Sequence, residues 1–196
     1  MRRVLILAVT LAAVVVALSG CGGDGNTNAN AGNANATKSE ANSNNANTPR
    51  NVALSSADRE FMSEAATGGL AEVELGRLAA QKGQSADVKR FGQRMVDDHS
   101  KANDELKQLA ARKGITLPAD LKDEQKKDKD KLSKLSGAEF DKEYMKLMVD
   151  DHDKDVKAFQ SEAKDGGDAD VKAFASKTLP TLEEHQRMAK EIKGKQ

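Results

Sequence analysis

The sequence predicts an all-α fold: an antiparallel up-down four-helix bundle with a charged connector helix between its second and third helices. Three observations predict it. Alanine, lysine, glutamate, aspartate and leucine dominate a chain with only 3% aromatic residues and 3 prolines, which favours helices over sheets. Four segments carry apolar residues at steps of three and four. Capping residues and glycines bracket those segments.

The first two helices form a predicted hairpin. The first is expected to begin after Ser55, a residue suited to the N-cap, and to end at Gly83. Ser85 is expected to cap the second helix, which ends at Gly114. Because only a few residues separate the two helices, they must be antiparallel neighbours.

The second predicted hairpin follows a highly charged segment, residues 115–135, which is expected to hold a short exposed helix. Residues 136–139, Ser-Gly-Ala-Glu, have the pattern of a capping box that opens the third long helix. That helix is expected to end at Gly166, and Asp168 then caps the fourth. Pro180 lies inside the fourth helix and should kink it. The bundle is therefore expected to span residues 54–193.

The amino terminus carries a targeting signal. Arg2 and Arg3 precede an apolar run that ends in Leu-Ser-Gly before Cys21, the one cysteine of the chain. This pattern resembles the lipobox of bacterial lipoproteins, which implies a signal peptide over residues 1–20 and a lipid on Cys21. An ordinary signal peptide or a single membrane anchor with an incidental cysteine is the alternative. Residues 21–53, rich in asparagine and alanine, form the predicted lipid anchor and disordered linker.

These features predict an address in the cell envelope, with the lipoprotein held on a membrane through Cys21 and facing the periplasm or the exterior. Lysine plus arginine and aspartate plus glutamate number 31 each, so no basic surface for nucleic acid is expected. Protein partners cannot be read from the sequence. No nucleophile–base pair, phosphate loop or zinc-protease motif is found, so we do not expect an enzyme.

Three histidines, each on a different predicted helix, interrupt the apolar stripes that face the core: His99, His152 and His185. The first helix contributes Glu72 at a core position, and Glu64 lies next to the same face. A buried carboxylate needs a cation, a histidine or a metal opposite it. At 1.5 Å per residue the four positions spread over roughly 12 Å along the bundle, so a single ring of four ligands does not follow from the spacing.

Two interpretations of this set stay open. In the first, the histidines form a buried polar layer, bonded to Glu72 and to acids such as Asp98 or Asp151, that fixes helix register. In the second, neutral imidazoles and one carboxylate bind Zn, Fe or Cu. A methionine lies about one turn from each histidine: Met95, Met148 and Met188. Their thioethers would suit Cu(I) as accessory ligands, although methionine at this spacing more often fills the core.

Four segments together resemble a family of exported bacterial ferritin-like four-helix domains of unknown function, described as outer-membrane proteins. They are GGLAEVELGRLA (68–79), VKRFGQRMVDDHSKANDELKQLAARKGITLP (88–118), FDKEYMKLMVDDH (140–152) and TLPTLEEHQRMA (178–189). The resemblance implies the bundle and the positions of Glu72 and the three histidines, but no activity. Ferritin di-iron centres use Glu-x-x-His, whereas Val96, Val149 and Leu182 stand three residues before the histidines here.

The first functional hypothesis is therefore a lipid-anchored envelope protein whose ferritin-like domain is a non-catalytic binding or structural module, with stress tolerance as one expected role. The alternative is a periplasmic metal-binding protein that holds Cu, Zn or Fe with Glu72, His99, His152 and His185.

Overall fold

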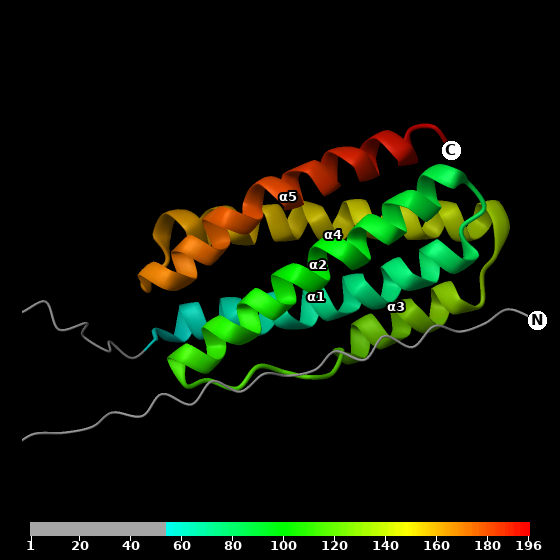
Figure 1. Cartoon of the computed structure of the whole chain (residues 1–196). Helices are drawn as coiled ribbons and strands as arrows, with labels where there is room; N and C mark the ends of the chain where they lie inside the picture. The colour runs from blue at the N-terminus through cyan, green and yellow to red at the C-terminus, as the bar shows by residue number, and fades with distance from the viewer. Residues whose placement is uncertain (1–53) are drawn as a thin grey trace, which may run out of the picture. The chain divides into compact units, whose positions relative to one another are not determined.

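The computed structural model describes residues 54–196, and this part of the chain contains five helices and no strand (Figure 1). The helices are α1 (Ser56–Lys82), α2 (Ala86–Lys113), α3 (Asp123–Ser133), α4 (Gly137–Asp165) and α5 (Ala169–Lys193). The predicted all-α class and the connector helix are confirmed. The predicted signal peptide (1–20), Cys21 and the linker (21–53) lie outside the described residues. None of the described helices combines the length and the apolar character that crossing a membrane requires.

Three of the predicted helix starts have the expected caps. Ser55 and Asp58 form a capping box, in which the Asp58 amide donates to Ser55 Oγ at 3.0 Å and the Ser55 amide donates to Asp58 Oδ2 at 3.2 Å. Ser85 Oγ accepts from the amide of Val88 at 3.1 Å. Asp168 accepts from the first amides of α5. These bonds satisfy amide groups that a helix leaves free at its first turn.

The capping box predicted at Ser136 is wrong, because the Ser136 side chain makes no capping bond. Asp141, the fifth residue of α4, makes a tertiary contact near this helix start. Its carboxylate accepts from the amides of Gln84 and Ser85 at 2.8 and 2.7 Å. This side chain therefore ties the start of α4 to the turn between α1 and α2, a contact between residues 57 positions apart.

The long helices pack as two hairpins, α1 with α2 and α4 with α5, and these hairpins meet through α2 against α5 and α1 against α4. Because Asp141 binds the α1–α2 turn, α2 and α4 begin at the same end of the domain and run parallel (Figure 1). The predicted up-down order of the four long helices is therefore wrong, because the chain crosses back through α3 before α4 begins. The chain returns to that end through α3, which lies against α1 and α4 (Figure 1). Buried Leu132 and ion pairs such as Lys129–Glu74, at 2.5 Å, hold α3 in place.

Two apolar clusters fill the interior. The first gathers around Phe91, Phe140 and Tyr144, at the end where α2 and α4 begin. The second gathers around Leu106 and Phe159. On each long helix the stripe passes from one cluster to the other through Glu72 or a histidine, so these four residues form a polar layer between two apolar cores. Within the described residues both clusters belong to one compact unit, which favours independent folding of this segment.

Helices α1 and α2 touch backbone to backbone where Gly76 faces Gly92. A Cβ added to either glycine would lie 2.7 Å from the carbonyl oxygen of the other. Only residues without a side chain allow this approach. The crossing holds α1 and α2 close together, one turn from Glu72 on α1 and about two turns from His99 on α2.

A second group of buried acids lies at the other end of the domain, where Glu162 of α4 meets Asp58 of α1. Their exposed fractions are 6% and 1%. The Asp58 carboxylate also accepts from the amide of Gly167 at 2.9 Å. Burial, followed by the charge of Asp58, raises the pKa of Glu162 to about 7.

We expect Glu162→Gln to stabilise the domain above pH 7 and to leave its stability unchanged below pH 4.5. The folded pKa is raised, so between these values the folded state binds more protons than the unfolded state and the free energy of unfolding falls as pH rises. The gain at pH 8 should be about 1–2 kcal/mol, because screening by nearby charges such as Lys172 leaves less than the full free energy of the pKa shift. Urea denaturation at pH 4.5 and 8 measures it. The control Glu183→Gln, on the exposed side of α5, should change stability equally at the two pH values. An equal effect of Glu162→Gln at both pH values would show that the pKa of Glu162 is not raised.

Candidate functional site

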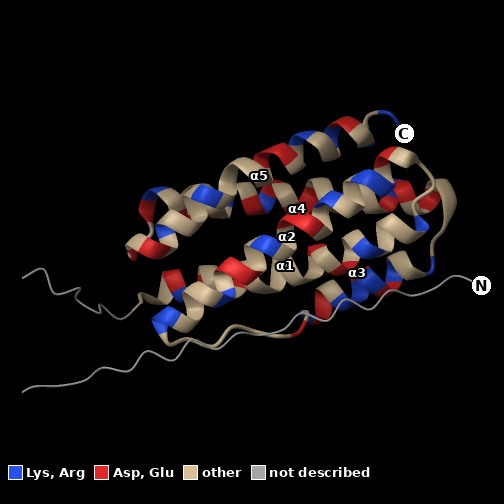
Figure 2. Ribbon diagram, viewed as in Figure 1, with Lys and Arg blue, Asp and Glu red and all other residues tan. Residues whose placement is uncertain are grey.

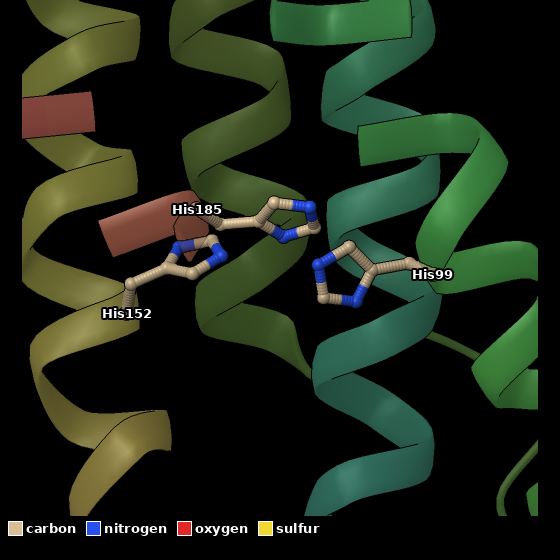
Figure 3. A group of neighbouring side chains, drawn as sticks. All are labelled: His99, His152 and His185. Atoms are coloured by element: carbon tan, nitrogen blue, oxygen red, sulfur yellow. The ribbon is translucent and has the colours of Figure 1, made fainter. Parts of the chain in front are cut away.

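The three histidines of the polar layer come from α2, α4 and α5 and meet in the interior (Figure 3). His99 is 5% exposed and the other two are 0% exposed. Their ring centroids are 5.9 Å apart for His99–His152, 5.2 Å for His99–His185 and 5.5 Å for His152–His185. The rings meet although the helix rise predicted that these residues would lie at different heights along the bundle. The helix rise gives the heights of the Cα atoms, whereas the side chains extend several ångströms from the Cα atoms and bring the ring nitrogens together.

Each imidazole has one ring nitrogen close to an oxygen of the protein. His99 Nδ1 lies 2.9 Å from Glu72 Oε2. His152 Nδ1 donates to the carbonyl oxygen of Met148 at 2.9 Å, and His185 Nε2 donates to Asp98 Oδ2 at 3.0 Å. These acceptors select the tautomer, so the second nitrogen of each ring carries a free lone pair.

The second nitrogens are buried and have no hydrogen-bond partner. They are Nε2 of His99, Nε2 of His152 and Nδ1 of His185. The three rings each offer a ligand nitrogen within 4.8 Å of the others. Bonds of about 2.0–2.1 Å to one ion would need nitrogens roughly 3.5 Å apart. Small ring movements would therefore suffice to bind a metal between them.

Glu72 supplies an oxygen donor to the same layer. It is 3% exposed, and its Oε1 lies 3.5 Å from His152 Nε2 without a hydrogen-bond partner. Burial raises the pKa of Glu72. Burial also lowers the pKa of each of the three histidines to about 4. The imidazoles are thus neutral at pH 7, which is the form that binds a metal.

The predicted accessory residues do not all lie near the histidines. Met95 and Met148 are fully buried and Met188 is partly buried, and all belong to the apolar cluster that borders the layer. Glu64 does not join the site: it is exposed on α1 and forms an ion pair with Lys122. Eight residues, or about 80° of helix rotation, separate it from Glu72, which turns it outward.

The acids that precede the histidines have separate contacts. Asp98 accepts from Arg94 at 3.2 Å as well as from His185. Arg94 also donates to Glu184 at 2.9 Å, so one arginine joins the acid of α2 to that of α5. Asp151 is half-buried and lies near Lys154, at 3.7 Å. Asp98 is therefore the acid of this group that orients a histidine.

The sequence-based interpretation missed two residues beside the layer. Asp155 lies close to Glu72, and burial, followed by the Glu72 charge, raises its pKa. Its spacing of three residues after His152 places it on the same helix face and could have identified it. Tyr144 belongs to the first apolar cluster, but its hydroxyl is buried without a hydrogen-bond partner. The Glu72 charge adds to burial in raising the pKa of Tyr144.

The fold and the site define an all-helical domain with a buried layer of three histidines and one glutamate. The chain belongs to the family described as Domain of unknown function (DUF4142), whose pattern matches residues 43–192. No curated protein matches the sequence.

Several solved structures share the fold. A DUF305 fragment from Deinococcus radiodurans has a TM-score of 0.65 and 12% identity, over 73% of this chain and 99% of the other. CopM in its Cu(I)-bound form has a TM-score of 0.58 and 16% identity, over 68% and 93%. A conserved hypothetical protein from Mycobacterium tuberculosis has a TM-score of 0.55 and 17% identity, over 71% and 92%. At these identities the likeness is one of fold.

Proposed function

We propose that this protein binds one transition-metal ion through His99, His152 and His185, with Glu72 as a further oxygen ligand. The observation that carries the proposal is the state of the ring nitrogens. One nitrogen of each ring lies 2.9–3.0 Å from an oxygen of the protein, and the other is buried without a hydrogen-bond partner. Such outer hydrogen bonds are typical of metal-ligating histidines.

The alternative, a polar layer that only fixes helix register, explains these atoms less well. A structural layer should satisfy its own polar atoms, because each buried group without a partner costs about 1–3 kcal/mol. Here three nitrogens and Glu72 Oε1 lack partners. A bound cation would satisfy all four at once.

Copper is the ion we favour, with zinc and iron(II) as the other candidates. Imidazole nitrogen suits all three, but the thioethers of Met95, Met148 and Met188, in the cluster beside the layer, suit Cu(I). CopM, which shares the fold, is known in Cu(I)- and Cu(II)-bound forms. The four proposed ligands lack the Glu-x-x-His pairs of di-iron centres.

We further propose that the domain is a ferritin-like bundle, because one long crossover through α3 joins its two hairpins. The buried layer favours holding an ion over turning over a substrate, so we propose binding without catalysis, with metal-stress tolerance as the role. Acidic and basic residues are interspersed over the helices (Figure 2), which supports the absence of a nucleic-acid surface.

The test uses the fact that the chain contains only three histidines. Residues 54–196 are titrated with Cu(I) and Zn(II), which are both diamagnetic, and the imidazole signals are followed by NMR. We expect one ion per chain and a shift of all three sets of ring signals together. Binding that leaves these signals in place, or no binding at micromolar protein, would overturn the proposal.

Asp98→Asn is expected to weaken metal binding about 10- to 100-fold without abolishing it, because Asp98 orients His185 through its Nε2. Competition with a chelator of known affinity measures the change. Asp97→Asn is the matched control, since Asp97 is exposed and accepts from Gln93 instead. Equal affinities for the two variants would show that the Asp98 bond does not position His185.

We also propose that the protein is a lipoprotein of the cell envelope, anchored in a membrane through Cys21 and facing the periplasm or the exterior. The single cysteine after Leu-Ser-Gly supports this proposal. Cys21→Ser should abolish labelling of the full chain by a radioactive or clickable fatty acid in a bacterial host. Unchanged labelling of the variant would refute the anchor.

A further inference from the structure

An ion bound to the histidine layer must first reach it, and the rings themselves are 0–5% exposed. A groove of about 410 Å³ runs between α1, α3 and α4 and has Glu72 among its lining residues. Apart from Lys122 and Lys154, every charged residue that lines this groove is acidic. Glu72 is therefore both a member of the histidine layer and part of the wall of a surface groove.

The acids of the groove become more buried toward the layer. Glu124 and Asp150 are exposed, Asp151 and Asp155 are half-buried, and Glu72 is buried. An acidic cleft concentrates cations from solution.

The groove and an interior cavity share lining residues beside Gly68. Gly68, Glu72 and Asp155 line the groove and also a cavity of about 20 Å³ that His99 lines. A Cβ built on Gly68 would meet no atom within 4 Å. The helix surface one turn before Glu72 is thus open, and a water-sized group has room there.

Glu72 is the point at which the groove meets the histidines. Its Oε1 has no hydrogen-bond partner although the residue is only 3% exposed. The same carboxylate lies 2.9 Å from His99 and 3.5 Å from His152. An unsatisfied buried oxygen at the inner end of an acidic groove is what a cation in transit would contact last before it reaches the rings.

We propose that this acidic groove is the entry route for the metal cation, which passes Asp151 and Asp155 to Glu72 and from there reaches His99 and His152. The inference rests on the proposed metal binding and adds the path and its selectivity: hydrated cations enter, and anionic metal complexes are repelled. Helix α3, which carries Glu124 and Asp128, forms the outer wall of the route.

The first test neutralises the mouth of the groove and leaves every proposed ligand intact. The triple variant Glu124→Gln, Asp128→Asn, Asp150→Asn is compared with Asp97→Asn, Asp104→Asn, Glu183→Gln, which removes the same charge from exposed positions on α2 and α5. In stopped-flow loading of residues 54–196 with Zn(II), we expect the groove variant to load about tenfold more slowly at low salt. The difference should shrink at high salt. Equal loading rates for the two triples would overturn the route.

The second test closes the passage. Gly68→Leu places a bulky side chain in the open space, whereas Gly68→Ala fills little of it. We expect the leucine variant to load, and to release Zn(II) to a chelator, at least about tenfold more slowly than the alanine variant. Its equilibrium affinity should stay unchanged, because a barrier alters both rates equally. Circular dichroism checks that the variants are folded, and unaltered rates in a folded leucine variant would contradict the path.

These outcomes separate the inference from the proposed function. If the unmodified protein binds no ion at equilibrium, the metal proposal fails. If it binds one ion at the histidines while both groove variants load at the unmodified rate, the metal proposal holds and the entry route fails.

Discussion

Alanine at any one of the three histidines is expected to weaken metal binding at least about 1,000-fold. Loss of an outer hydrogen-bond partner typically costs 10- to 100-fold, and loss of a direct ligand should cost more. The effect should be similar for His99→Ala, His152→Ala and His185→Ala, because each ring contributes one free buried nitrogen to the same layer. Competition titration with a chelator measures the affinity of each variant.

Thermal unfolding gives a second measure of the same prediction. An ion that binds the folded state alone adds about 2.7 kcal/mol to stability when its free concentration is 100 times its dissociation constant. The unmodified domain should show this gain and the three variants should not. Gln93→Ala, on the exposed face of α2, serves as the control and should keep the gain. Full affinity in any one histidine variant would show that its ring is not a ligand and would favour a structural layer.

Replacing Gly92 with alanine is expected to destabilise the domain by about 1–2 kcal/mol. The new Cβ would lie 2.7 Å from the carbonyl oxygen of Gly76, 2.8 Å from Ala79 Cβ and 2.9 Å from the amide nitrogen of Ala80. These atoms belong to the backbone or to a side chain of one carbon, so none can rotate aside. The two helices must separate, and overpacking of this kind outweighs the helix-propensity gain of about 1 kcal/mol. Urea denaturation measures the loss.

Gly68→Ala is the matched comparison on α1. Its Cβ would meet no neighbouring atom within 4 Å. The substitution should therefore stabilise the domain by about 0.5–1 kcal/mol through helix propensity alone. The two changes are chemically identical and have opposite expected signs. A neutral or stabilising result for Gly92→Ala would mean that α1 and α2 do not cross in backbone contact at Gly76 and Gly92.

Local signals predicted the helices because the atoms that decide helix starts and ends are close in sequence. Ser55, Ser85 and Asp168 each bond an amide two or three residues ahead, so their roles can be read from neighbouring residues. Ser136 has the same local pattern but makes no such bond. Nothing in the local sequence shows that Asp141 contacts the distant α1–α2 turn, since this contact exists only after the hairpins have met.

The sequence by itself determined that Glu72, His99, His152 and His185 face the interior, because the 3.6-residue period sets the direction of each side chain around its helix. Tertiary structure decided the rest. The level at which helices meet depends on their crossing, here at Gly76 and Gly92, and side-chain torsions decide which atoms point inward. That is why one nitrogen of each histidine is left free in a common layer.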